Sequence, residues 1–160
     1  MISSSTYKGC TVARQPPAPA PLARRLTYLL GRTAASAGRR ANEKMSVLAI
    51  DTRHYAVLAA IADSERPSQQ DVAAALGIDR ATLVAVADDL EAQGLIRRDR
   101  SDSDRRAYAL TLTSKGATIL KRADALMDQC EEEFTGVLTQ AERAQLADLL
   151  GRLFSAGSPG

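Results

Sequence analysis

A run of ten residues, 97–106, concentrates charge in this 160-residue chain. It reads RRDRSDSDRR and contains five arginines, three aspartates and two serines. A tail that only neutralises phosphates would omit the acids, and a merely solvated loop would not need so many arginines. The composition of the run alone leaves its role open, and the elements around it must decide what it does.

The remaining composition points to a helical protein with local basic surfaces. Hydrophobic residues make up 45% of the chain, aromatic residues only 4%, and tryptophan is absent. The core must therefore consist mainly of Leu, Ala, Val and Ile, a set that favours helices. The net charge is only +2, but residues 1–44 carry eight bases and one acid, whereas residues 107–160 carry five bases and seven acids. We therefore expect basic patches on a chain that is only mildly basic overall.

Residue types and spacing argue against a catalytic or metal site. The chain has one histidine, His54, and two cysteines, Cys10 and Cys130, with neither metal-ligand spacing nor a disulfide framework. Because there is no Ser–His–Asp set and no glycine-rich phosphate loop, we expect neither an enzyme nor a bound cofactor or metal. No apolar run reaches the length of a membrane span, and the N-terminus lacks a signal-peptide core. We expect a cytoplasmic protein that does not associate with a membrane.

The elements that must position the charged run begin after residue 20. Residues 1–20 contain Ser, Thr, Gly and a proline cluster, which predicts a disordered tail. A first helix is predicted from Leu22 to about Met45, because leucines recur there at helical spacing. A second helix is predicted over residues 52–64. The stripe that it buries is expected to contain Tyr55, Leu58 and Ala62, widened by Val57 and Ile61.

Two further helices are predicted on either side of a tight turn. Ser68 is a good N-cap for a third helix, and Gly77 fits its C-terminal cap. Asp79 fits the N-cap of a fourth helix, which runs to Gln93 and is stopped by Gly94. The residues expected to face inward are Val72, Ala75 and Leu76 in the third helix and Leu83, Val86, Ala87 and Leu90 in the fourth.

A hairpin with the charged run as its loop is predicted next. Residues 95–98 form a short first strand, and residues 108–112 form a half-buried second strand in which Tyr108, Leu110 and Leu112 alternate with Ala109 and Thr111. A long helix over residues 114–134 follows. Thr139 and Glu142 predict a capping box for a last helix. Its apolar stripe is expected to contain Leu146, Leu149, Leu150 and Leu153.

This order of elements predicts a winged helix-turn-helix, in which the fourth helix is the recognition helix for double-stranded DNA. The predicted fold class is α+β, mainly helical. The flanking helices are too apolar for one small core, so they are expected to form a helical dimerisation domain. The predicted division is a disordered tail (1–20), a dimerisation helix (21–45), the DNA-binding domain (46–113) and C-terminal dimerisation helices (114–156). A two-fold homodimer would present recognition helices roughly 34–36 Å apart.

Four blocks of the sequence resemble the MarR family of bacterial transcription regulators. They are HYAVLAAIAD, SQQDVAAALGIDRATLVAVADDLEAQGLIRR, SDSDRRAYALTLTSKG and LTQAERAQLADLLGRLF, and DRRAYALTLTSKG is the most specific part. The resemblance covers residues 22–154. It implies a ligand-responsive repressor that binds a pseudo-palindromic operator as a homodimer. It also implies a small aromatic or phenolic effector bound between the dimerisation and DNA-binding parts.

The wing residues expected to act are Asp104, Arg105 and Arg106. The resemblance implies that Arg105 or Arg106 enters a minor groove, and a narrow groove attracts arginine through its negative potential. Asp102 and Asp104 would accept hydrogen bonds from the arginines and hold them in place. The alternative is a solvated hairpin loop without DNA contacts.

The predicted recognition helix departs from the pattern of the family. It presents Ala81 and Ala85 where family members often carry arginine or another polar residue. Alanine cannot hydrogen-bond to base edges but can meet thymine methyl groups, and Arg80 and Thr82 would add polar contacts. Asp88 and Asp89 on the same helix would be repelled by phosphates.

Further candidates for phosphate contacts lie outside the recognition helix. Ser68 and Gln69 stand at the start of the third helix, where backbone N–H groups favour anions, although the surer role of Ser68 is as a cap. Arg98 stands beside Arg97 where the hairpin leaves the recognition helix; one of these two arginines could contact a phosphate, and both could equally be solvated strand ends.

The candidate effector residues are Tyr28, His54 and Tyr55, and for His54 a half-buried structural role is the alternative. Cys130 is expected to be a buried, inert thiol, and Cys10 lies in the tail. Two other functions stay open. One is a dimer of the same fold that has lost tight DNA binding and acts as a small-molecule or protein-binding module; the other is a cysteine-based redox regulator.

Overall fold

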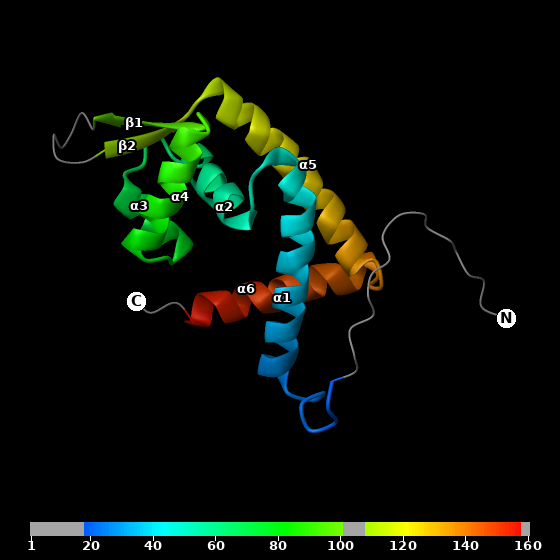
Figure 1. Cartoon of the computed structure of the whole chain (residues 1–160). Coiled ribbons are helices and arrows are strands. Elements are labelled where there is room, and N and C mark those ends of the chain that lie inside the picture. Colours follow the sequence, from blue (N-terminus) through cyan, green and yellow to red (C-terminus); the bar gives the residue numbers. More distant parts are fainter. Residues whose placement is uncertain (1–17, 101–107, 158–160) are drawn as a thin grey trace. The chain divides into compact units, whose positions relative to one another are not determined.

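The structure is a computed structural model that describes residues 18–100 and 108–157 (Figure 1). The chain divides into two compact units, Met1–Ala34 and Ala35–Gly160. The described residues are mostly helical and contain one two-stranded antiparallel sheet, which confirms the predicted α+β class. In chain order the elements are α1 (Leu26–Met45), the 3-10 helix η1 (Ser46–Leu48), α2 (Thr52–Ala62), α3 (Gln69–Leu76), α4 (Arg80–Ala92), β1 (Ile96–Arg100), β2 (Tyr108–Leu112), α5 (Ser114–Thr135) and α6 (Gln140–Gly157).

The described part of the first unit contains turns followed by the start of α1. The carbonyl oxygen of Pro19 accepts hydrogen bonds from the N–H groups of Leu22 (2.8 Å) and Ala23 (3.0 Å). These bonds close turns instead of a regular helix, so the predicted start at Leu22 is wrong and α1 begins at Leu26. The apolar side chains of this segment are exposed by 38–75%; they are Leu22, Leu26, Leu29 and Leu30.

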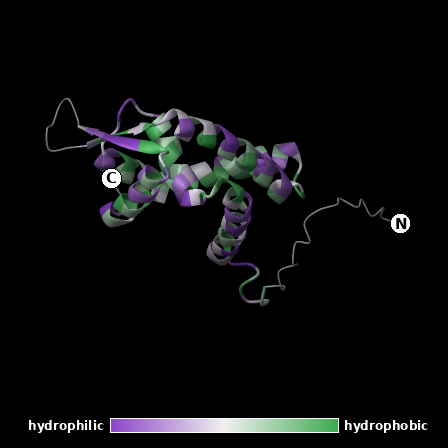
Figure 2. Ribbon diagram, turned by 45° about the horizontal axis from the view of Figure 1, so that its top comes forward, coloured by the Kyte–Doolittle hydropathy of each residue, from purple (hydrophilic) through white to green (hydrophobic). Residues whose placement is uncertain are grey.

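The second unit has one hydrophobic core, built from the end of α1, helices α2 to α5 and both strands. Hydrophobic and hydrophilic residues alternate along the helices, the pattern typical of helices with one apolar face (Figure 2). All four residues predicted for the inner face of α4 are buried, namely Leu83, Val86, Ala87 and Leu90. The core therefore holds α4 by one face and leaves the other to solvent.

Three predictions about buried residues are wrong. Ala75 is exposed because Val72, Ala73 and Leu76 define the inner stripe of α3, which turns Ala75 outward. Ala62 is exposed as the last residue of α2. In β2 the expected alternation fails, because Tyr108 is exposed while both Ala109 and Leu110 are buried.

The failed alternation in β2 has a structural cause. Ser68 forms an isolated antiparallel bridge with Ala109, and the N–H of Leu110 donates to the carbonyl of Pro67 at 2.8 Å. The segment before α3 thus covers β2 and buries two successive residues. β1 pairs with β2 in the register Ile96↔Leu112 to Arg100↔Tyr108, so β1 begins and ends later than the predicted strand at residues 95–98.

The start of α5 packs closely against the turn before β1. The carbonyl oxygen of Leu95 would lie 1.9 Å from a Cβ atom added at Gly116, so only glycine fits there. The same carbonyl accepts a hydrogen bond from the Thr113 N–H at 3.0 Å, and the ammonium of Lys115 donates to the carbonyl of Gln93 at 2.7 Å. Thr113, Lys115 and Gly116 belong to the sequence block LTSKG. Their contacts with Gln93 and Leu95 anchor the start of α5 to the end of the helix-turn-helix.

Candidate nucleic-acid interface

The turn between α3 and α4 is defined by caps on both helices. Ser68 and Asp71 form a reciprocal capping box at the start of α3, in which the Ser68 hydroxyl donates to the Asp71 carboxylate at 2.7 Å. Gly77 ends α3 with φ 63°, and its N–H donates to the carbonyls of Ala73 and Ala74. Asp79 then caps α4. As predicted, these local signals place α4 as the second helix of a helix-turn-helix.

The predicted polar residue Thr82 is engaged within the cap of α4. Its hydroxyl donates to Asp79 Oδ2 at 2.6 Å, and its backbone N–H donates to Asp79 Oδ1 at 2.9 Å. These hydrogen bonds from Thr82 lower the pKa of Asp79. Thr82 therefore holds the start of α4 in shape, and its hydroxyl proton is already committed to the cap.

The solvent face of α4 carries a shallow apolar hollow. Ala81 and Ala85 are exposed and Val84 is half-buried, and Arg80 and Asp88 complete the lining. The structure thus brings together the predicted contact residues Arg80, Ala81 and Ala85. It adds Val84, which helical spacing places beside Ala81 and Ala85 on the outward face of the helix.

Arg98 connects β1 to α4 through two ion pairs. Its guanidinium lies 2.5 Å from a carboxylate oxygen of Asp88 and 2.5 Å from one of Glu91. Its backbone N–H also donates to Glu91 at 3.2 Å. The Arg98 side chain is only 18% exposed, whereas that of Arg97 is 66% exposed. Sequence reasoning missed this clamp, because the three residues meet only when the hairpin folds back beside α4.

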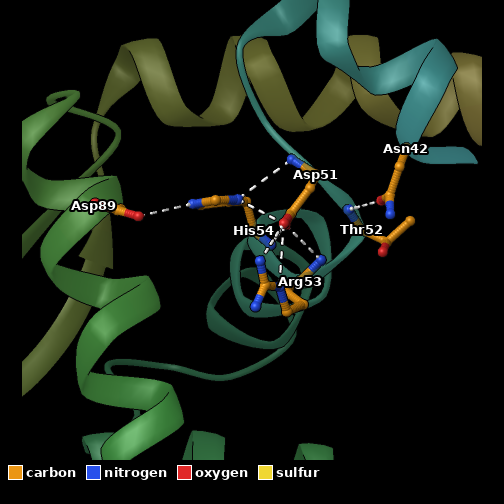
Figure 3. A network of polar contacts seen from close by, with 6 residues as sticks. All are labelled: Asn42, Asp51, Thr52, Arg53, His54 and Asp89. Carbon is orange, nitrogen blue, oxygen red and sulfur yellow. Dashed lines mark hydrogen bonds and ion pairs between the residues drawn. The ribbon is translucent and has the colours of Figure 1, made fainter. Parts of the chain in front are cut away.

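A polar network at the start of α2 contains the predicted residue His54 (Figure 3). Asp51 caps α2 by accepting from the N–H groups of Arg53 (2.9 Å) and His54 (3.0 Å). The imidazole Nδ1 lies 2.7 Å from the Asp51 carboxylate, and Nε2 lies 3.8 Å from that of Asp89 on α4. Burial raises the pKa of Asp51, but the hydrogen bonds from His54 and Arg53 outweigh it and lower this pKa to about 2.

The other candidate effector residues lie in different surroundings. The Tyr55 hydroxyl donates to Asp124 on α5 at 2.9 Å. Burial, followed by this hydrogen bond and the charge of Asp124, raises the pKa of Tyr55 to about 12. Tyr28 lies in the first unit and is half-buried. Tyr55 and His54 are neighbours on α2, yet Tyr55 contacts α5 while His54 faces α4.

The wing residues Asp102, Asp104, Arg105 and Arg106, and also Cys10, lie outside the described residues. Cys130 is a free thiol that is buried as predicted, and burial raises its pKa. Among residues 18–100 and 108–157, no group of three or more His, Cys, Asp and Glu side chains could hold a metal ion. Within the same ranges, no single helix has both the length and the apolar composition needed to cross a membrane.

Three known proteins resemble this chain over most of its described part. A transcriptional regulatory protein for the hcr operon of Thauera aromatica is 38% identical over 65% of this chain, which spans 63% of that protein's length. The transcriptional regulator HosA of Escherichia coli O111:H- is 33% identical over 64% of this chain and 76% of its own. The transcriptional repressor CouR, solved bound to a 23-mer DNA duplex, has a TM-score of 0.80 and 31% identity, covering 84% of this chain and 95% of that one.

A second structure of CouR, from Rhodococcus jostii RHA1 and bound to p-coumaroyl-CoA, has a TM-score of 0.74 and 26% identity, and covers 82% of this chain and 93% of its own. The sequence pattern described as MarR family matches residues 50–107, which contain α2, α3, α4 and β1. A relative that is 33% identical over 76% of its own length, a DNA-bound repressor that is 31% identical over 95% of its own length, and the family pattern together show that the chain belongs to the MarR family, as its sequence blocks predicted.

Proposed function

We propose that the protein is a sequence-specific DNA-binding transcription regulator, a repressor that binds a pseudo-palindromic operator as a homodimer. The observation that carries this proposal is the capped α3–α4 unit with its hairpin, in a chain that matches a DNA-bound repressor over 84% of its length. In such a unit the second helix enters the major groove while the wing contacts the adjacent backbone or minor groove.

The ion pairs of Arg98 reduce the negative charge of α4 without cancelling it. Asp88 and Glu91 would repel phosphates, but the guanidinium of Arg98 pairs with both carboxylates. Arg80 at the start of α4 is exposed, and Gln69 at the start of α3 is half-buried. We therefore assign DNA contacts to Arg80, Ala81, Ala85 and Gln69, and structural roles to Ser68, Thr82 and Arg98. The wing residues Asp104, Arg105 and Arg106 complete the proposed interface.

Exposed apolar residues outside the DNA-binding part support a homodimer. No residue of α6 is buried, although the helix carries a stripe of large apolar side chains. In the first unit, Leu26 is 75% exposed. We retain the proposed division into a tail (1–20), a dimerisation helix (21–45), a DNA-binding domain (46–113) and C-terminal dimerisation helices (114–156). The stripe on α6 comprises Leu146, Leu149, Leu150, Leu153 and Phe154.

A small aromatic or phenolic effector completes the proposal, supported by the CouR structure with p-coumaroyl-CoA. An effector can release DNA only by binding one dimer geometry better than another. Tyr28, His54 and Tyr55 are the proposed sensing residues. The protein is proposed to act in the cytoplasm, where bacterial promoters lie, and to regulate without catalysis.

Binding of the full chain to its own upstream DNA tests this function. The DNA and a scrambled duplex are compared by fluorescence anisotropy at about 50 and 200 mM salt, a range over which 6–10 phosphate contacts cost roughly 10³–10⁵ in affinity. We expect tight, sequence-selective and salt-sensitive binding that Arg105→Ala/Arg106→Ala weakens and that the exposed-helix control Arg122→Ala leaves unchanged. Weak binding without sequence preference would instead indicate the alternative, a ligand- or protein-binding dimer of the same fold.

A further inference from the structure

We propose that the hollow on α4 is a binding site for the C5-methyl groups of pyrimidines in the major groove. Thymine would be read there by its methyl group instead of by hydrogen bonds to its base edge, and 5-methylcytosine would present the same group. This inference rests on the proposed function and specifies how the recognition helix discriminates among sequences. Its residues are Ala81, Val84 and Ala85.

The first support is that three polar side chains near the hollow, those of Thr82, Asp88 and Glu91, are engaged within the protein. Thr82 is bound to Asp79, with its hydroxyl 2.6 Å from the carboxylate. Asp88 is paired with Arg98 at 2.5 Å. Glu91 shares the same guanidinium. The residue types that usually read bases by hydrogen bonds are therefore either absent from the centre of this face or turned toward the helix-turn-helix itself.

The second support is the chemistry of what stays exposed. Ala81 and Ala85 present methyl groups one helical turn apart, and the half-buried Val84 lies between them in the hollow. Among the groups that base pairs expose in the major groove, only the C5-methyl of thymine is apolar. Burying one such methyl group strengthens binding about fourfold.

Arg80 gives the hollow an orientation on the duplex. It lines one end of the hollow at the first residue of α4, whereas Asp88, paired with Arg98, lines the other end. A guanidinium at this place can bond a phosphate or a guanine while the apolar segment lies over neighbouring bases. Duplex DNA thus complements the site in two ways. Its negative charge suits Arg80, and the methyl groups of thymine suit those of Ala81 and Ala85.

The test begins with DNA sites selected by the full-length protein from a random duplex pool. Failure to select any site would refute the proposed function itself. In a selected site, each thymine is then replaced singly by uracil, which lacks only the methyl group and leaves the minor-groove edge unchanged. We expect about fourfold weaker binding at one or more positions in each half-site. Selective binding that no uracil substitution weakens would overturn the methyl-reading inference alone.

A second comparison separates methyl contact from altered DNA stiffness. At the sensitive positions, 5-methylcytosine should bind about fourfold better than cytosine. The loss of affinity caused by replacing thymine with uracil, the uracil penalty, should be smaller in the variant Ala81→Ser/Ala85→Ser, which places hydroxyl groups in the hollow. It should persist in Ala92→Ser, a matched change on α4 outside the hollow. A penalty that is equal in both variants would assign the effect to DNA shape and refute the site.

Discussion

The guanidinium of Arg98 on β1 lies 2.5 Å from the carboxylate of Asp88 on α4, so the wing and the proposed recognition helix are joined by an ion pair. The same guanidinium binds Glu91 one turn further along α4. This contact couples the position of the hairpin to that of the helix. It also offsets part of the negative charge that the sequence places on a helix expected to approach phosphates.

Replacing Arg98 by alanine is expected to weaken both the fold and DNA binding. The side chain is 18% exposed, so loss of its charged hydrogen bonds should lower the free energy of unfolding by about 1–2 kcal/mol. The two freed carboxylates should reduce DNA affinity about 3–10-fold. Urea unfolding and anisotropy titrations would measure these effects. Arg97→Ala, at a side chain 66% exposed, is the matched control, and equal losses in both variants would contradict the clamp.

Gly116→Ala is expected to destabilise the protein strongly. The added Cβ would lie 1.9 Å from the carbonyl oxygen of Leu95, so the start of α5 must move away from the turn before β1. We expect a loss of about 2–3 kcal/mol in thermal or urea unfolding. Gly38→Ala is the opposite case, because that site on α1 is open, and it should stabilise the helix by about 0.5–1 kcal/mol.

The Asp51 cap predicts a pH-dependent contribution to stability. Its pKa is lowered from 3.8 to about 2 in the folded chain, so the contribution is fully present above pH 4 and is lost as the pH falls toward 2. Allowing for solvent screening, we expect about 1 kcal/mol. The stability difference between the unmodified chain and Asp51→Asn should therefore vanish between pH 4 and pH 2. A difference that stays constant across this range would disprove the assignment; Asp63→Asn at the exposed end of α2 is the control.

Leu153→Glu on α6 is expected to shift the proposed dimer toward monomer. Leu153 is 58% exposed, so a charged side chain costs the folded subunit little but would be buried in an interface. We expect at least a tenfold rise in the dimer dissociation constant, measured by sedimentation equilibrium. Ala144→Glu adds the same charge to the opposite face of α6 and should leave the association unchanged. Equal dimer dissociation constants for the two variants would show that the interface does not include this stripe of α6.

Asp104→Ala tests the proposed role of acids in the charged run. If Asp104 holds Arg105 or Arg106 in position, its removal should weaken DNA binding even though one negative charge near DNA is lost. We expect a roughly threefold to tenfold loss, with Asp63→Ala as a control for net charge. A gain in affinity would show that simple charge repulsion dominates.

The sequence by itself determined the order of the elements, because the signals for them are local. Ser68, Gly77 and Asp79 act within one helical turn of the ends that they cap, and the inner stripe of α4 follows from helical periodicity alone. The MarR resemblance rested on these same blocks. The outward position of Ala81 and Ala85 also followed, since burying one face of a helix exposes the other.

The tertiary structure decided which side chains are free to act. Arg98 was a candidate phosphate contact in the sequence, but it pairs with Asp88 and Glu91 once the hairpin returns beside α4. Burial of Ala109 required Ser68 to bridge to β2, and the need for glycine at residue 116 required the close approach of Leu95. Each of these contacts joins residues from different elements. Periodicity and capping rules describe single elements, so they do not predict the partners that packing brings together.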